Sequence, residues 1–235
     1  MTEAIIPLLT LIVLEVVLGI DNIIFISILA DRLPPSDAKR LRFIGLGLAM
    51  IIRMLLLAVI TWILKLDKTL FTVMNIEISG KGLILLAGGI FLLYKSTSEI
   101  YHKTELANHS APQTPQNASF GRLLMEVLLL DLVFSIDSII TAVGMVESLW
   151  VMYTAVVVTV IIMMFASGPI SSFIKNHPSF KILALSFLMM IGVSLIAEGL
   201  HFEIPKGYIY FAMAFSFLVD VIQMKAIPAS NQKSD

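Results

Sequence analysis

Two carboxylates and an amide interrupt an apolar stretch near the start of the chain. Glu15 is followed by Asp21 and Asn22 within the segment LEVVLGIDNII, which begins at Leu14. Carboxylate and amide oxygens are the ligands that hard divalent cations such as Mn²⁺, Mg²⁺ and Ca²⁺ prefer. The stretch therefore has the chemistry of a cation site in an apolar setting.

The same pattern recurs 116 residues later, in a segment that begins at Leu130. The two segments are identical at six of eleven positions. Each acid of the first segment, and its polar residue, aligns with a residue of similar chemistry in the second. The matched pairs are Glu15 with Asp131, Asp21 with Asp137, and Asn22 with Ser138. Composition alone does not repeat acids at a fixed spacing, so the pattern predicts an internal repeat whose six polar residues are the candidate metal ligands.

Helical geometry limits how these ligands can meet. Glu15 and Asn22 are seven residues apart and share a helix face, whereas Asp21 points about 120° away from Glu15. All the ligands can converge only if each helix is locally loosened. We expect this loosening at Gly19 and Ser135, where freed backbone carbonyls would add oxygen ligands.

The composition places these residues inside a membrane protein. Of 235 residues, 58% are hydrophobic and 14% are charged, which is unlike a soluble domain. A net charge of −1 argues against a nucleic-acid partner, and the absence of cysteine excludes disulfides, thiolate metal sites and cysteine nucleophiles. The four acids near the bilayer centre would cost on the order of 10 kcal/mol together, so they require compensation.

A bilayer core needs about 20 apolar residues per helix, and seven segments meet this length. They are residues 4–29, 41–64, 80–100, 121–146, 150–174, 180–200 and 207–226. The first lacks a basic start and a small-residue cleavage site, so we expect no removable signal peptide. The sequence therefore predicts an all-α membrane protein with seven transmembrane helices.

Loop charges predict the orientation. With the N-terminus outside, eleven basic residues lie on the inner side and four on the outer side, which favours N-out, C-in. We expect a first three-helix repeat over 1–100, a cytoplasmic linker over 101–120, a second three-helix repeat over 121–200, and a seventh helix with a short tail over 201–235. Because three is odd, the second repeat is inverted, which places a binding site near the membrane midplane.

Four further charged residues are candidates for coupling or gating. Arg53 lies within the second helix and is either a counter-charge for the empty site or part of a structural salt bridge. Glu126 is either a proton-relay acid or an ordinary acid at a helix start. Glu198, like Glu99 in the first half, is a gate residue or an interfacial one, and Asp220 is a candidate for coupling or ion entry.

Motifs along nearly the whole chain resemble the TerC family, within the wider LysE-like transporter group. The similar segments are EVVLGIDN (15–22), ADRLP (30–34), LDLVFSIDSIITAVGM (130–145), FLMMIGVSLIAEG (187–199) and IPKGYIYFAMAFS (204–216). The resemblance implies a seven-helix exporter with manganese as the leading substrate, and an ion site lined by the six repeated polar residues. It also implies a bacterial inner membrane and, in larger relatives, soluble domains that we do not expect after Asp235.

These observations predict a secondary transporter that exports divalent metal ions, most readily Mn²⁺, in possible exchange for protons. We expect no enzyme and no cofactor besides the transported cation; the partners are the metal ion and the lipid bilayer. Two alternatives stay open: a scaffold that delivers metal to exported proteins, and an intramembrane hydrolase that uses an aspartate pair. Metal selectivity, oligomeric state and the choice between export, tellurite-linked resistance and metal delivery are not determined by the sequence.

Overall fold

Helices make up nearly all of the protein in the computed structural model, which describes residues 2–59, 69–73, 76–104, 119–146, 148–202 and 204–226. The helices are α1 (Thr2–Ala30), α2 (Pro35–Ala58), α4 (Gly80–Thr104), α5 (Phe120–Met145), α6 (Leu149–Asn176), α7 (Pro178–Gly199) and α8 (Lys206–Ala226). The all-α prediction of seven helices is confirmed. Except for α2, each helix begins and ends close to the predicted residues.

The second helix lies earlier in the chain than the predicted segment 41–64. It begins at Pro35, where a missing backbone N–H is tolerated, and Asp37 in its first turn suits the helix dipole. It ends at Ala58, and residues 60–64 lie outside the described residues. Most of the predicted linker, residues 105–118, and the tail after Ala226 also lie outside them.

A short hairpin, which the sequence analysis did not predict, precedes α4. Strands β1 (Thr69–Val73) and β2 (Ile76–Ser79) pair antiparallel, with an irregularity in register near β1's start. The backbone N–H of Gly82 donates a hydrogen bond to Ser79 Oγ at 3.0 Å, so the end of the hairpin caps the first turn of α4.

Six of the described helices are long and apolar enough to cross a membrane: α1, α2, α4, α6, α7 and α8. The remaining helix, α5, carries four charged residues, and three of them are buried within the protein. Helix α5 runs antiparallel to α4, because Gly88 faces Val133 while Lys95 contacts Glu126. It therefore traverses the bundle alongside the other helices, with its charges turned inward.

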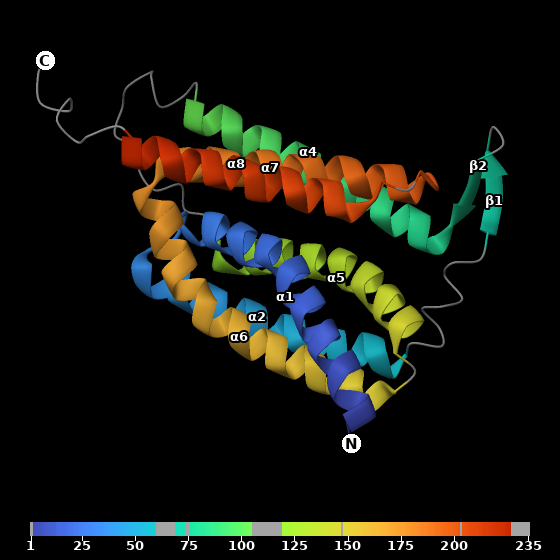
Figure 1. The fold of residues 1–235 in the computed structure, drawn as a ribbon. Coiled ribbons are helices and arrows are strands. Elements are labelled where there is room, and N and C mark those ends of the chain that lie inside the picture. Colours follow the sequence, from blue (N-terminus) through green and yellow to red (C-terminus); the bar gives the residue numbers. More distant parts are fainter. Residues whose placement is uncertain are drawn as a thin grey trace, which may run out of the picture.

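The helices form two layers (Figure 1). Helices α4, α7 and α8 lie together along one side, and α1, α2, α5 and α6 pack against one another on the other side. We call α4, α7 and α8 the three-helix layer, and α1, α2, α5 and α6 the four-helix layer. Large exposed apolar side chains, such as Phe165 on α6 and Phe211 on α8, cover the outer surface, whereas many polar groups are buried inside, as expected in lipid.

Glycines allow α4 and α7 to approach at backbone contact. A Cβ atom added to Gly82 would lie 2.8 Å from the carbonyl oxygen of Gly199, and one added to Gly89 would lie 2.6 Å from that of Gly192. Conversely, a Cβ atom added to Gly199 would lie 2.8 Å from the carbonyl oxygen of Gly82, and one added to Gly192 would lie 3.0 Å from that of Gly89. This reciprocal, antiparallel contact is what an inverted repeat produces between its third helices, although the repeat itself stays a prediction.

Candidate functional site

Two of the six predicted ligands pair with one buried arginine, and a third joins them through a hydrogen bond to one of the two. Arg53 on α2 is only 3% exposed. Its Nη1 donates a hydrogen bond to Glu15 Oε2 at 2.5 Å, and its Nη2 donates to Asp131 Oδ1 at 2.8 Å. Asn22 Nδ2 also donates to Asp131 Oδ1, at 3.1 Å. Glu15, Asn22, Arg53 and Asp131 together are called the arginine cluster.

The helices that carry the arginine cluster explain its shape. Glu15 and Asn22 share a face of α1, as their seven-residue spacing predicts. Helices α2 and α5 run parallel and pack closely, since Gly45 leaves room for Val127. This packing brings Arg53 beside Asp131, whose second oxygen accepts a hydrogen bond from Ser135 Oγ at 3.2 Å. A buried guanidinium with two carboxylates is well hydrogen-bonded and leaves the cluster with a formal charge of −1.

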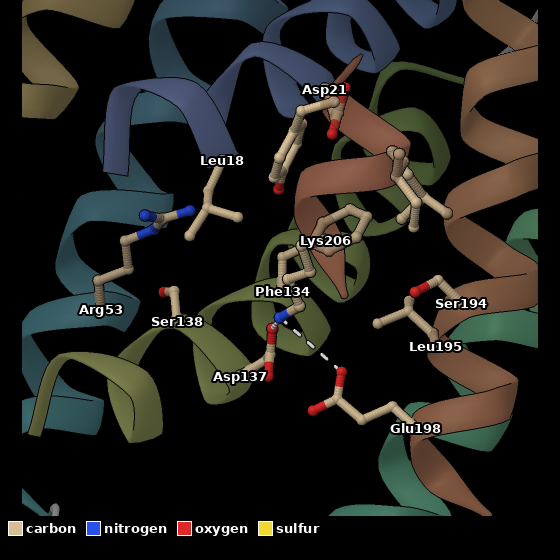
Figure 2. A pocket seen from close by; sticks show the side chains of 13 residues that line it. Leu18, Asp21, Arg53, Phe134, Asp137, Ser138, Ser194, Leu195, Glu198 and Lys206 are labelled. Carbon is tan, nitrogen blue, oxygen red and sulfur yellow. Dashed lines mark hydrogen bonds and ion pairs between the residues drawn. The ribbon is translucent and has the colours of Figure 1, made fainter. Parts of the chain in front are cut away.

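The remaining acids line a small cavity between the two layers, with a volume of about 50 Å³ (Figure 2). The four-helix layer contributes Leu18, Asp21, Arg53, Phe134, Asp137 and Ser138, and the three-helix layer contributes Ile191, Ser194, Leu195, Glu198, Lys206, Ile209 and Tyr210. We call it the interlayer cavity. Ser138, the last predicted ligand, lies in its wall and donates a long hydrogen bond of 3.4 Å to the carbonyl of Ser135.

Two lysines of the three-helix layer pair with two acids of the interlayer cavity, Asp137 of α5 and Glu198 of α7. Lys206 forms an ion pair with Asp137 and lies 3.8 Å from Glu198. Lys81 lies 3.0 Å from Glu198 and 3.8 Å from Asp137. Figure 2 shows the Lys206 ammonium directed towards both carboxylates, with Asp21 across the cavity from them. Each ammonium therefore contacts both acids, and the four side chains form a closed network.

Asp21 differs from the other acids of the site because no described residue pairs with it. Its side chain is buried, at 6% exposure, and faces the interlayer cavity. Within the part of the chain that the structure describes, it makes no hydrogen bond or ion pair. An isolated buried carboxylate is costly, so Asp21 is the least compensated acid of this site.

The expected loosening of the two helices is wrong. Both α1 and α5 are continuous α-helix through Gly19 and Ser135, although α1 bends near its middle in Figure 1. Their backbone carbonyls stay in the helical hydrogen-bond pattern and are not released as ligands. Since the helix is intact, Glu15 and Asp21 keep their 120° separation, and the acids divide between the arginine cluster and the cavity. Among the described residues, no three His, Cys, Asp or Glu side chains come together closely enough to hold a metal.

A second group of ion pairs connects the layers at the opposite end of the bundle. Arg32, after α1, pairs with Glu99 of α4, and Lys181 of α7 lies 2.7 Å from Asp31. Lys95 of α4 lies 2.7 Å from Glu126 of α5, which also contacts Arg122 at 3.4 Å. Glu126 and Glu99 are thus interlayer contacts, whereas Asp220 lies fourteen residues along α8 from Lys206, about 21 Å away, outside both groups.

Sequence reasoning missed Lys81 and Lys206. Both were counted only as loop charges that set the orientation, because each stands at the start of an apolar helix where a solvated lysine is ordinary. One signal was available in the predicted orientation. Lys81 and Lys206 lie on the outer side of the membrane, and the helices that carry Asp137 and Glu198 also end on that side. That coincidence could have suggested ion pairs at this end of the bundle.

Comparisons with known proteins identify the family of this chain. The family described as "Integral membrane protein TerC family" matches residues 1–235. The chain is 52% identical over 223 residues to a "UPF0053 protein" of Haemophilus influenzae, which covers 95% of this chain and 94% of that protein. It is also 50% identical over 219 residues to "UPF0053 inner membrane protein YoaE" of Escherichia coli.

The Escherichia coli relatives are longer. The match to YoaE covers 93% of this chain and 42% of YoaE, and the match to "UPF0053 protein YegH", at 48% identity, covers 94% and 42%. The chain therefore spans less than half the length of these relatives. No solved structure matches it. The full-length family match, the identity to the Haemophilus influenzae relative and the membrane-length helices establish that the chain is an integral inner-membrane protein of the TerC family.

Proposed function

We propose that this protein is a secondary transporter that exports divalent metal ions, with Mn²⁺ as its leading substrate. One observation carries the proposal: the acids of the arginine cluster and the interlayer cavity outnumber their cations by two. The acids are Glu15, Asp21, Asp131, Asp137 and Glu198, and the cations are Arg53, Lys81 and Lys206. With all of them ionised, the formal charge is −2, which one divalent cation neutralises.

The ligand chemistry supports a hard metal ion. Asp21, Asp137 and Glu198 supply carboxylate oxygens, and Ser138 supplies a hydroxyl in the cavity wall. An all-oxygen set suits Mn²⁺, Mg²⁺ and Ca²⁺ better than metals that prefer imidazole or thiolate. Arg53 pairs with both Glu15 and Asp131 and offsets one of their two negative charges, which supports a role as the counter-charge of the site.

The arrangement of the ion pairs supports alternating access. Both groups of ion pairs join the three-helix layer to the four-helix layer, one at each end, and the cavity lies at the interface between the layers. Opening one group while the other stays closed would expose the cavity to one side of the membrane at a time. Carboxylates that release the metal can take up protons, so proton exchange is the coupling that we propose.

The test is Mn²⁺ flux into proteoliposomes that contain the purified protein, with Mg²⁺ and Ca²⁺ as competitors and a pH-sensitive dye inside. Asp21→Asn should abolish flux, whereas Asp37→Asn, in the partly exposed first turn of α2, should leave it unchanged. A dye signal that accompanies flux would support proton exchange. If well-folded wild-type protein moves no metal under any gradient, the transport proposal fails, and metal delivery to exported proteins or hydrolysis by an aspartate pair takes its place.

A further inference from the structure

We propose that the ammonium of Lys206 is a tethered cation that occupies the interlayer cavity in place of the metal and is displaced when the metal binds. This inference rests on the proposed function and adds a mechanism for metal release. Lys206 contacts both Asp137 and Glu198, the two acids of the cavity that would otherwise join Asp21 as ligands. The cavity therefore already holds one cation, supplied by the protein itself.

The carboxylate oxygens that Lys206 contacts make the two cations exclusive. The cavity is small, at about 50 Å³, and Lys206 forms part of its wall. A divalent metal ion needs carboxylate oxygens at about 2.0 to 2.6 Å. A metal at that distance from Asp137 would stand where the Lys206 ammonium now makes its ion pair. Metal binding must therefore move the ammonium away, and return of the ammonium must help to expel the metal.

Asp21 explains why a metal ion can displace the ammonium of Lys206. Its buried carboxylate faces the cavity without a partner among the described residues, and the ammonium of Lys206 makes no contact with it. Among the described residues no three acids are close enough together to hold a metal as they stand, so a metal ion would contact Asp21 together with the two other acids only after these side chains close around it. The tethered ammonium reaches only Asp137 and Glu198. Asp21 is thus a negative charge that an incoming metal ion can neutralise, as a proton does in the exchange proposed above.

Lys206, rather than Lys81, has the freedom to leave. The Lys81 side chain is 16% exposed, and it stands at the start of α4, whose first turn is in backbone contact with α7 at Gly82 and Gly199. The Lys206 side chain is 36% exposed and begins α8, a helix of which only 6% is buried within the protein. Beside it, Gly207 has open space around it. Lys206 can therefore swing out of the cavity while Lys81 stays.

The first experiment measures Mn²⁺ affinity by calorimetry on purified, detergent-solubilised protein. Removing a competing cation should tighten binding, so Lys206→Met should lower the dissociation constant at least fivefold, within the usual range of coupling between two ligands. Lys206→Arg, which keeps the charge, should bind close to the wild-type value. Lys39→Met, at the exposed start of α2, is the matched control and should change nothing. In proteoliposomes, Lys206→Met should lower both KM and kcat, because release slows.

The second experiment needs no variant and so does not depend on how Lys206→Met folds. An amine-acylating reagent should modify Lys206 faster when Mn²⁺ is present, because the displaced ammonium loses its ion pairs, whereas acylation of Lys39 should not change. Mass spectrometry of the labelled peptides measures both rates. Faster labelling at Lys206 alone supports displacement.

The outcomes separate this inference from the proposed function. If the wild type binds and transports Mn²⁺ but Lys206→Met binds it equally or more weakly, or if Mn²⁺ does not speed labelling of Lys206, the displacement mechanism is wrong and transport stands. If the wild type neither binds nor transports a divalent metal, the proposed function fails and displacement fails with it.

Discussion

Arg53 Nη1 and Glu15 Oε2 lie 2.5 Å apart in the interior of the bundle, and the same guanidinium contacts Asp131 from the other half of the chain. One cation thus joins the first acids of both repeated motifs. Because burial of each charge is offset only by the others, the arginine cluster is a point at which stability and function depend on the same atoms.

Removal of Arg53 should destabilise the protein strongly. Arg53→Met leaves two buried carboxylates without a cation, and breaking a buried ion pair from one side typically costs about 3–5 kcal/mol. Denaturant unfolding in detergent measures the loss. The double variant Arg53→Met with Asp131→Asn should recover part of it, because one uncompensated charge is gone. Equal stability of Arg53→Met and wild type would show that the acids do not rely on this arginine.

Asp21 should lower the stability of the metal-free protein and be required for metal binding. Asp21→Asn removes an unpartnered buried charge, so the metal-free variant should have a higher melting temperature than the wild type. Mn²⁺ should raise the melting temperature of the wild type, as any ligand of the native state does, and should not raise that of the variant. A variant that is less stable without metal would mean that Asp21 has a structural partner after all.

The close approach of the two layers at Gly88 should be essential. A Cβ atom at this position would lie 2.5 Å from a methyl group of Val133, across the interface between α4 and α5. Gly88→Ala should therefore separate the layers and reduce Mn²⁺ flux. Adding Val133→Ala should restore flux, because it removes the methyl groups that clash. Gly168→Ala is the control, since no atom lies within 4 Å of its Cβ position.

Cross-linking should distinguish contacts between layers from contacts within one. The protein has no cysteine, so pairs can be introduced freely. A short thiol cross-linker between cysteines at Lys95 and Glu126 should stop flux, because it fixes the three-helix layer to the four-helix layer. The same reagent at Arg42 and Ser171, which lie 3.1 Å apart within the four-helix layer, should leave flux intact. Flux that survives the first cross-link would exclude movement of the layers at that end.

The sequence predicts the helices well because their cause is local. Apolar runs of membrane length specify α1, α4, α6, α7 and α8, and the acid spacing places Glu15 and Asn22 on one face. Even the division of the site follows from helix geometry, since Asp21 points away from Glu15 unless the helix breaks. We predicted the break because convergence of the ligands was assumed, and the intact α1 shows that assumption to be wrong.

The ion pairs of the site depend on tertiary packing, which the spacing of apolar residues along the chain does not encode. Nothing in the local sequence of Lys206 separates it from a solvated lysine at a helix start, and its partners lie 8 and 69 residues away. The hairpin before α4 was missed for a different reason. Its strands are only five and four residues long, and such short segments give little signal beside a membrane helix.

The parallel packing of α2 and α5 has a consequence for how the chain enters the membrane. Ribosomal synthesis makes α2 before α5, so Arg53 precedes the Asp131 with which it pairs in the folded protein. The helix that carries the most internal charge thus follows its counter-charge along the chain, and pairing with Arg53 would lower the cost of transferring Asp131 into lipid. The order of residues along the chain is therefore also an order of assembly, with the cation first and the second acid after it.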